Sequence, residues 1–336
     1  MKLKSILASF IIFQSVLCWV SLAIAAAQPL TPRAVTASAY IERGNSWFTK
    51  GENERALADY DLAIASDPGH AGAYYNRALS RYRMKDYERA ISDFTRAIQL
   101  NPRYIEAYGE RSAARYALGD LDGVISDLSK VIELDPRLAI AWNNRGLARS
   151  GKGDHQGALA DFDRAIKLDP RRAVFYDNRG VARSRIGDFS GAISDHTQAI
   201  KLKPDFVEAW NDRGAARQFK GDLDGALADY NQAIKLDPRF ADAWFNRATY
   251  WKANGNLERA EADFTQAIEL KPYWADAYGQ RGLMRLLSDR DGEAEKDFAR
   301  CLALNKNLKQ SLDRLIAEAK QQLFCNPKPE QTGGKK

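Results

Sequence analysis

Residues 139–172 read AIAWNNRGLARSGKGDHQGALADFDRAIKLDPRR, and this stretch decides the fold. It holds two segments with apolar residues at helical spacing, separated by Gly153 and Asp154 and closed by Pro170. Glycine ends a helix without steric cost, an acid favours the start of the next helix, and proline stops a helix because it lacks an amide donor. The stretch therefore predicts two short helices joined by a tight turn.

The pattern of this stretch returns along the chain with a period of 34 residues. Proline marks the period at Pro68, Pro102, Pro136, Pro170, Pro204, Pro238 and Pro272. Framed on these prolines, eight repeats cover residues 37–308: 37–70, 71–104, 105–138, 139–172, 173–206, 207–240, 241–274 and 275–308. A fixed period of this length indicates a repeat architecture. One such hairpin buries too little apolar area to offset its ordering entropy, so we expect neighbouring repeats to stack.

Each repeat places the same residue types at the same positions. Position 4 is aromatic in all eight repeats: Tyr40, Tyr74, Tyr108, Trp142, Tyr176, Trp210, Trp244 and Tyr278. Position 8 is glycine in five repeats, position 20 is small, position 24 is mostly aromatic, and positions 27 and 32 are mostly alanine and proline. Large residues that face small ones let two helices pack closely. This pattern resembles the tetratricopeptide repeat over residues 37–308, which are 272 of the 336 residues.

The resemblance implies an all-α fold, an α-solenoid superhelix of eight helix-turn-helix repeats whose first helices form a concave face that binds peptides or partner proteins. Repeat eight lacks the turn glycine and the closing proline, and residues 308–324 carry leucine, isoleucine and alanine at helical spacing. We expect 308–324 to form a capping helix over the last open face. The tail at 325–336, rich in proline, glycine and lysine, is expected to be disordered.

Residues 1–27 differ from the rest of the chain. Lys2 and Lys4 precede an apolar run that ends in three alanines, which is typical of a secretory signal peptide. An uncleaved anchor is the alternative, because the run approaches the roughly 20 residues that span a bilayer. The sequence thus predicts an exported protein, periplasmic or secreted, with a linker over 28–36 and membrane contact only through an uncleaved signal.

The composition and the scattered reactive residues argue against several functions. Removal of a leader with two lysines lowers the formal net charge from +6 to +4, a mild value that argues against nucleic-acid binding. His70, His155 and His196 lie far apart in the repeat pattern, and no nucleophile or phosphate-loop motif occurs. We therefore expect no enzyme, no cofactor and no metal site. Cys301 and Cys325 are expected to be free thiols, because they would lie about 20 Å apart along the predicted cap.

Two further positions are uniform and oppositely charged. Position 7 is arginine in every repeat: Arg43, Arg77, Arg111, Arg145, Arg179, Arg213, Arg247 and Arg281. Position 23 is aspartate in every repeat: Asp59, Asp93, Asp127, Asp161, Asp195, Asp229, Asp263 and Asp297. In an antiparallel hairpin that turns at position 15, positions that sum to about 30 lie opposite each other. We therefore predict eight structural ion pairs, one inside each hairpin.

Position 11 carries a second set of arginines: Arg81, Arg115, Arg149, Arg183, Arg217 and Arg285. No equally uniform acid remains for this set, and the acids at position 16 are its candidate partners. Three interpretations stay open: stems packed between repeats with their heads on local acids, a basic strip for an acidic ligand, or simple solvated charge. Aromatic residues at the family's groove positions complete the candidate ligand-binding set: Tyr75, Tyr82, Tyr116 and Phe245.

These predictions favour a non-catalytic, extracytoplasmic scaffold that binds partner proteins or peptides in the groove of its repeats. The alternative is a protein that binds an anionic polymer or another acidic ligand through the arginine strip.

Overall fold

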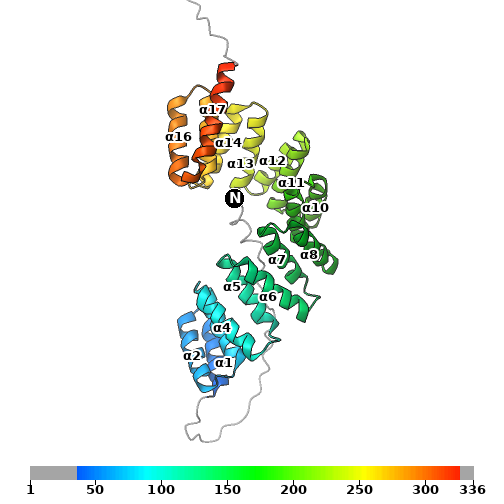
Figure 1. Cartoon of the computed structure of the whole chain (residues 1–336), viewed down its shortest axis with the longest axis vertical. Coiled ribbons are helices and arrows are strands. Elements are labelled where there is room, and N and C mark those ends of the chain that lie inside the picture. The colour runs from blue at the N-terminus through cyan, green and yellow to red at the C-terminus, as the bar shows by residue number, and fades with distance from the viewer. Residues whose placement is uncertain (1–35, 326–336) are drawn as a thin grey trace, which may run out of the picture. The chain divides into compact units, whose positions relative to one another are not determined.

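The computed structural model describes residues 36–325, so the predicted leader at 1–27, nearly all of the linker and the tail after Cys325 lie outside the described residues. Every regular element in this range is helical, and residues 36–325 contain no strand (Figure 1). The chain divides into two compact units, Met1–Ala182 and Arg183–Lys336, which are described one at a time. The boundary falls within helix α9 (Ala173–Arg185).

The N-terminal unit consists of antiparallel helix pairs, one for each repeat. Its helices before α9 are α1 (Ala37–Thr49), α2 (Asn53–Ser66), α3 (Ala71–Arg83), α4 (Tyr87–Leu100), α5 (Ile105–Ala117), α6 (Leu121–Leu134), α7 (Ala139–Gly151) and α8 (His155–Leu168). The two helices of each pair pack against each other, and each second helix also packs on the first helix of the following pair, from α2 on α3 to α6 on α7 (Figure 1). This arrangement buries the apolar face that one hairpin alone would expose.

The C-terminal unit follows the same plan and ends in a cap. Its helices after α9 are α10 (Phe189–Leu202), α11 (Val207–Lys220), α12 (Leu223–Leu236), α13 (Ala241–Ala253), α14 (Leu257–Leu270), α15 (Ala275–Leu287), α16 (Asp291–Leu304) and α17 (Lys309–Cys325), with a 3-10 turn, η2 (Lys306–Leu308), before α17. The capping helix thus starts at Lys309, after this short turn. It packs on α15 and buries Leu312 and Ala319, while Cys301 of α16 is a buried free thiol. No helix among the described residues combines the length and the apolar character that crossing a membrane requires.

The turn within each repeat depends on its glycine and on the acid that follows. Six glycines at position 15 have φ between 74° and 88°, a conformation that carries a steric cost for residues with a Cβ atom: Gly51, Gly119, Gly153, Gly187, Gly221 and Gly255. In repeats two to seven the next residue then caps the second helix, as Asp154 does by accepting a hydrogen bond from the Gly157 amide. Lys85 and Asp289 replace this glycine in repeats two and eight and adopt the same left-handed conformation.

In repeats one, four, six and eight the core includes a close contact between glycine at position 8 and the ring at position 24. A Cβ atom added to Gly146 would lie 2.8 Å from Cε1 of Phe162, and one added to Gly44 would lie 2.6 Å from Cε1 of Tyr60. Phe162 and Tyr60 are fully or almost fully buried. Glycine at position 8 therefore lets the first helix approach the ring on the second helix, which holds the two helices at a fixed distance.

Candidate functional site

The arginines of position 7 and the aspartates of position 23 meet inside the hairpins, as the spacing predicted. In the seven pairs that lie within one unit, arginine Nε donates to Asp Oδ2 at 2.7–3.0 Å and Nη2 donates to Oδ1 at 2.5–2.8 Å. Arg179 and Asp195 belong to different units. Two parallel charge-assisted hydrogen bonds of this kind fix both side chains. In repeat eight, the bonds to Asp297 raise the pKa of the Arg281 guanidinium.

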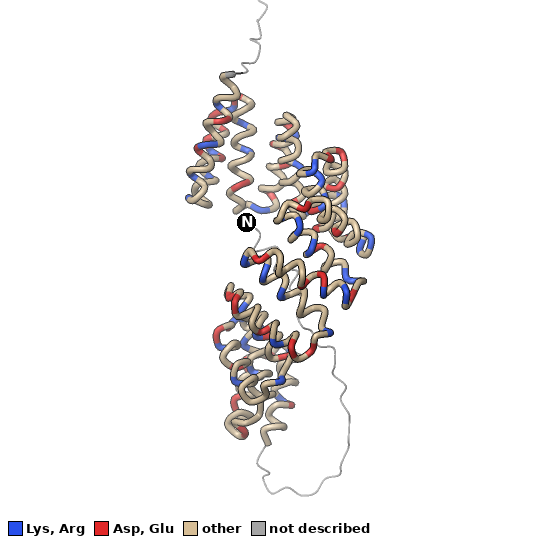
Figure 2. Tube along the Cα trace, turned by 45° about the vertical axis from the view of Figure 1, so that its right-hand side comes forward, with Lys and Arg blue, Asp and Glu red and all other residues tan. Residues whose placement is uncertain are grey.

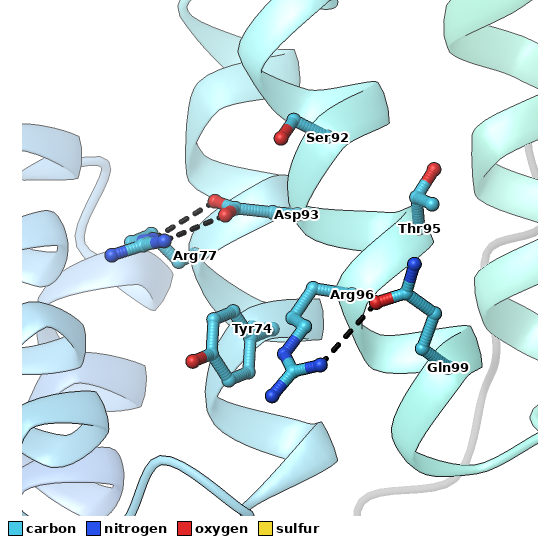
Figure 3. Close-up of a pocket in the computed structure, with 7 residues that line it drawn as sticks. All are labelled: Tyr74, Arg77, Ser92, Asp93, Thr95, Arg96 and Gln99. Carbon is cyan, nitrogen blue, oxygen red and sulfur yellow. Dashed lines mark hydrogen bonds and ion pairs between the residues drawn. The ribbon is translucent and has the colours of Figure 1, made fainter.

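Each position-7 arginine also lies over the aromatic ring three residues earlier in its own helix. The guanidinium carbon is 4.7–5.7 Å from the ring centroid in all eight repeats. Figure 3 shows one example, with Arg77 reaching Asp93 on the neighbouring helix and Tyr74 on the same helix as Arg77. Position 4 is therefore aromatic because its ring supports the arginine through a cation–π contact.

The same arginines make a third contact that the sequence analysis missed. Nη1 donates to a side-chain oxygen at position 25 of the preceding repeat, at 2.6–3.3 Å. The acceptors are Asp61, Thr95, Ser129, Asp163, Thr197, Asn231 and Thr265. Position 25 of repeat eight is Ala299, and no ninth repeat follows it. The sequence thus carried the signal: position 25 has a side-chain oxygen in every repeat that is followed by another repeat.

The position-11 arginines have a different principal partner from the one expected. Their Nη1 atoms lie 2.7–3.0 Å from Oδ2 of the position-23 aspartate. In repeats two, three, four, six and eight this aspartate therefore receives two arginines. The position-16 acids are only secondary neighbours, at 3.4–3.8 Å where the contact occurs. The candidate partners at position 16 are thus not the principal ones, because one carboxylate has enough lone pairs for both guanidinium groups.

This pairing withdraws the position-11 arginines from solvent. The exposed fraction of their side chains is 17–26% for all six: Arg81, Arg115, Arg149, Arg183, Arg217 and Arg285. In repeats three to six the Nη1 atom also donates to a backbone carbonyl in the first turn of the second helix. Figure 2 shows acidic and basic residues interleaved along the helices of each unit. The arginines therefore act mainly within the repeat.

The aromatic candidates for ligand binding also pack against other aromatic or core residues. Tyr75 lies 4.8 Å from the ring of Tyr104, and Tyr82 meets the edge of Tyr87 at 5.4 Å. Tyr75, Tyr82 and Tyr116 all pack against one core cluster, which includes Phe94 and Leu128. In the C-terminal unit, Phe245 stacks on Trp274 with 4.4 Å between the ring centroids. These residues remain partly exposed, so each contributes both to the core and to the surface of its first helix.

One charged residue of this surface, Glu110 on α5, was not singled out from the sequence. Glu110 is 5% exposed, and burial raises the pKa of its carboxyl group to about 7. Within residues 36–325 it has no hydrogen-bond or ion-pair partner. Burial first, and the charge of Glu110 second, raise the pKa of both Tyr75 and Tyr82 on α3. The signal was its place at position 6, where five of the other repeats have an amide.

An open hollow of about 460 Å³ lies beside the ion pair of repeat two. It is lined by Tyr74, Arg77, Ser92, Asp93, Thr95, Arg96 and Gln99 (Figure 3). Arg77 and Asp93 are already paired, and Arg96 donates to Gln99 at 3.3 Å. The hollow therefore offers hydroxyl groups and one exposed arginine, but no group positioned for acid–base or nucleophilic chemistry.

The histidines do not come together. Nδ1 of His70 caps α3 by accepting a hydrogen bond from the Ala73 amide, and His196 is buried at position 24. Among residues 36–325 there is no group of three or more His, Cys, Asp or Glu side chains that could hold a metal ion.

Comparisons with known proteins agree with this architecture. Models of the tetratricopeptide repeat match residues 71–104, 139–172 and 241–274, and a TPR repeat model matches 220–254. A search of curated proteins finds no match. The chain belongs to the tetratricopeptide repeat family, and its fold is the all-α solenoid of that family, which confirms the prediction from the 34-residue period.

Solved structures show the same fold at low sequence identity. A tetratricopeptide repeat protein from Parabacteroides merdae has a TM-score of 0.62 and 18% identity, over 74% of this chain and 98% of that one. The APC/C hetero-tetramer Cut9–Hcn1 has a TM-score of 0.61 and 16% identity, over 85% and 57%. The C-terminal part of a TPR repeat-containing protein from Cytophaga hutchinsonii has a TM-score of 0.57 and 16% identity, over 71% and 98%. At these identities the likeness concerns the fold alone.

Proposed function

We propose that this protein is a non-catalytic scaffold that binds partner proteins or peptides along the first helices of its repeats, outside the cytoplasm. The observation that carries the proposal is the tetratricopeptide repeat itself, whose presence suggests protein–protein interaction. In the N-terminal unit α3 contacts both α1 and α5, and in the C-terminal unit α11 contacts α13. The first helices therefore adjoin one another at these junctions and form a surface that a partner can follow.

The chemistry of this surface favours a protein partner over an anionic polymer. Its aromatic residues are partly exposed, and aromatic side chains contribute strongly to protein interfaces. The position-11 arginines that would attract an anionic polymer are held by the position-23 aspartates. Binding through a basic strip would weaken steeply with salt, whereas binding through apolar and aromatic groups would change little.

The location outside the cytoplasm rests on the sequence of residues 1–27. A basic start, an apolar run and small residues before Gln28 support export and cleavage. Amino-terminal sequencing of the protein recovered from the cell envelope tests this directly. A mature chain that begins near Gln28 is expected. A chain that keeps Met1 and stays in the membrane fraction would instead support the uncleaved anchor.

Affinity capture from the envelope fraction, followed by mass spectrometry, tests the scaffold. We expect a defined partner that is retained at 0.5 M salt and shows no turnover with the purified protein alone. Phe219→Ser probes this surface, because Phe219 lies on the first helix α11, is 75% exposed and stacks on Phe189 with 5.1 Å between the ring centroids, and the variant should capture less of the partner. Loss of all captured protein at moderate salt would favour an anionic ligand instead.

A further inference from the structure

Glu110 is a buried carboxyl group for which the fold supplies no cation. It is 5% exposed, and no described residue donates a hydrogen bond to it or forms an ion pair with it. A buried charge without a partner carries a large desolvation cost. Such departures from the local rule of a repeat occur at sites that serve a function.

The same position is satisfied elsewhere in the chain by a residue of the preceding repeat. Asn76 bonds to Asn45 at 3.0 Å, Asn178 bonds to Asn143 at 2.8 Å, and Asn246 bonds to Asn211 at 2.8 Å. These contacts join the first helices of neighbouring repeats. At Glu110 the preceding repeat offers Tyr75 at position 5 in place of an asparagine, so no such bond forms.

One junction in the C-terminal unit shows what can occupy this space. Lys252, at position 12 of repeat seven, donates from Nζ to Oε1 of Gln280, at position 6 of repeat eight, at 2.8 Å. The equivalent residues at the Glu110 junction are Tyr82 and Glu110. A cationic side chain that enters beside Tyr82 therefore comes within reach of Glu110, as Lys252 reaches Gln280.

We propose that Glu110, with the rings of Tyr75 and Tyr82, forms a site that receives an arginine or lysine side chain of the bound partner. The Glu110 site rests on the proposed scaffold function and specifies the chemistry of its partner. The carboxylate supplies charge-assisted hydrogen bonds, and the rings supply cation–π contacts in a partly dehydrated place. The arginines of the repeats do not compete, because the position-23 aspartates hold them.

Protonation of Glu110 should compete with the cation. The titratable groups that interact with it are Tyr75 and Tyr82 on α3, and Tyr104 and Glu106 act in turn on Tyr75. None of these groups is basic. Since the pKa of Glu110 is about 7, binding requires loss of a proton at lower pH. Affinity for a cation is therefore expected to be about tenfold weaker at pH 6 than at pH 8.

The test uses the full-length protein with N-acetyl-arginine amide as probe and N-acetyl-citrulline amide as its neutral match. Binding is followed through the ring resonances of the tyrosines. We expect the arginine probe to bind more tightly than the citrulline probe, and Glu110→Gln to weaken arginine binding at least tenfold. Glu42→Gln, at the exposed position 6 of repeat one, is the matched control and should bind like the wild type.

A second variant keeps the test independent of damage at Glu110. Tyr82→Lys copies Lys252 and should fill the site from within, so that the variant folds normally but no longer binds the arginine probe. Equal binding of arginine and citrulline, or equal affinity of the wild type and Glu110→Gln, would overturn the proposal. If envelope partners are captured equally by both proteins, only the Glu110 site fails. If neither captures a partner, the scaffold itself fails.

Discussion

The first repeat and the interior repeats use the same arginine in different surroundings. Arg43 in repeat one pairs with Asp59 but has no preceding repeat, and its side chain is 55% exposed. Arg145 in repeat four pairs with Asp161, also bonds to Ser129 of repeat three, and is 12% exposed. The difference shows that the position-7 arginine has two tasks: it closes its own hairpin and ties that hairpin to the one before.

The largest expected effect comes from removing the acid that holds two arginines. Asp161→Ala strands both Arg145 and Arg149 in a mostly buried place and should lower the free energy of unfolding by about 4 kcal/mol. Asp59→Ala strands only the exposed Arg43, because position 11 of repeat one is Trp47, and should cost far less. Urea unfolding followed by circular dichroism measures both variants. Equal losses would show that burial and the second arginine are unimportant.

Position 6 allows the same comparison between an interior repeat and repeat one, here with the acidic residues Glu110 and Glu42. Below pH 4.5 Glu110 is protonated in both states, but between about 4.5 and 7 the unfolded chain ionises first, so burial of Glu110 progressively reduces stability. Glu110→Gln should therefore stabilise the protein by about 3 kcal/mol at pH 8 and hardly at all at pH 4. Glu42→Gln, at the exposed position 6 of repeat one, is the control. Melting curves across pH would contradict the assignment if both variants behaved alike.

Helix packing inside the repeat gives a smaller expected effect. Gly146→Ala would place a Cβ atom 2.8 Å from Phe162 in a repeat with neighbours on both sides, and should cost about 2 kcal/mol. Gly44→Ala makes a similar contact with Tyr60 in repeat one, which has a neighbour on one side only and can relax. Thermal melting should show the larger loss for Gly146→Ala, and the reverse order would argue against tighter packing in the interior.

The bond between repeats should give the smallest effect. Ser129→Ala removes the hydroxyl that accepts from Arg145 and should cost about 1 kcal/mol. Ala299→Thr adds a hydroxyl at the same position of repeat eight. No further repeat supplies a position-7 arginine to bond to it, so stability should be unchanged. A gain from Ala299→Thr as large as the loss from Ser129→Ala would mean that the hydroxyl acts within its own helix.

The sequence allowed the prediction of the fold and of the paired ladders, because a 34-residue period lets the chain be compared with itself. The opposition of Arg145 and Asp161 follows from hairpin geometry alone. The partner of Arg149 could not be predicted in this way. Matching one aspartate to one arginine by position leaves none for Arg149, whereas the carboxylate of Asp161 accepts from both guanidinium groups.

The contacts between repeats were harder to predict. Predicting that Ser129 accepts from Arg145 requires knowing how far neighbouring hairpins are shifted along each other. The lack of a side-chain oxygen at Ala299, in the last repeat, was visible in the sequence. The isolation of Glu110 depends on Tyr75 replacing an asparagine and on the burial that the surrounding rings produce. Burial is a property of the packed repeats, and position numbers alone do not give it.

A double-mutant cycle between Ser129 and Arg145 tests most directly whether the arginine ties one repeat to the next. Arg145→Met keeps the apolar stem and leaves Asp161 paired with Arg149. If the tie exists, Ser129→Ala destabilises the wild type by about 1 kcal/mol more than it destabilises the Arg145→Met background, where it removes only the bond from the Ser129 hydroxyl to the Ile125 carbonyl. The same loss in both backgrounds would contradict the account.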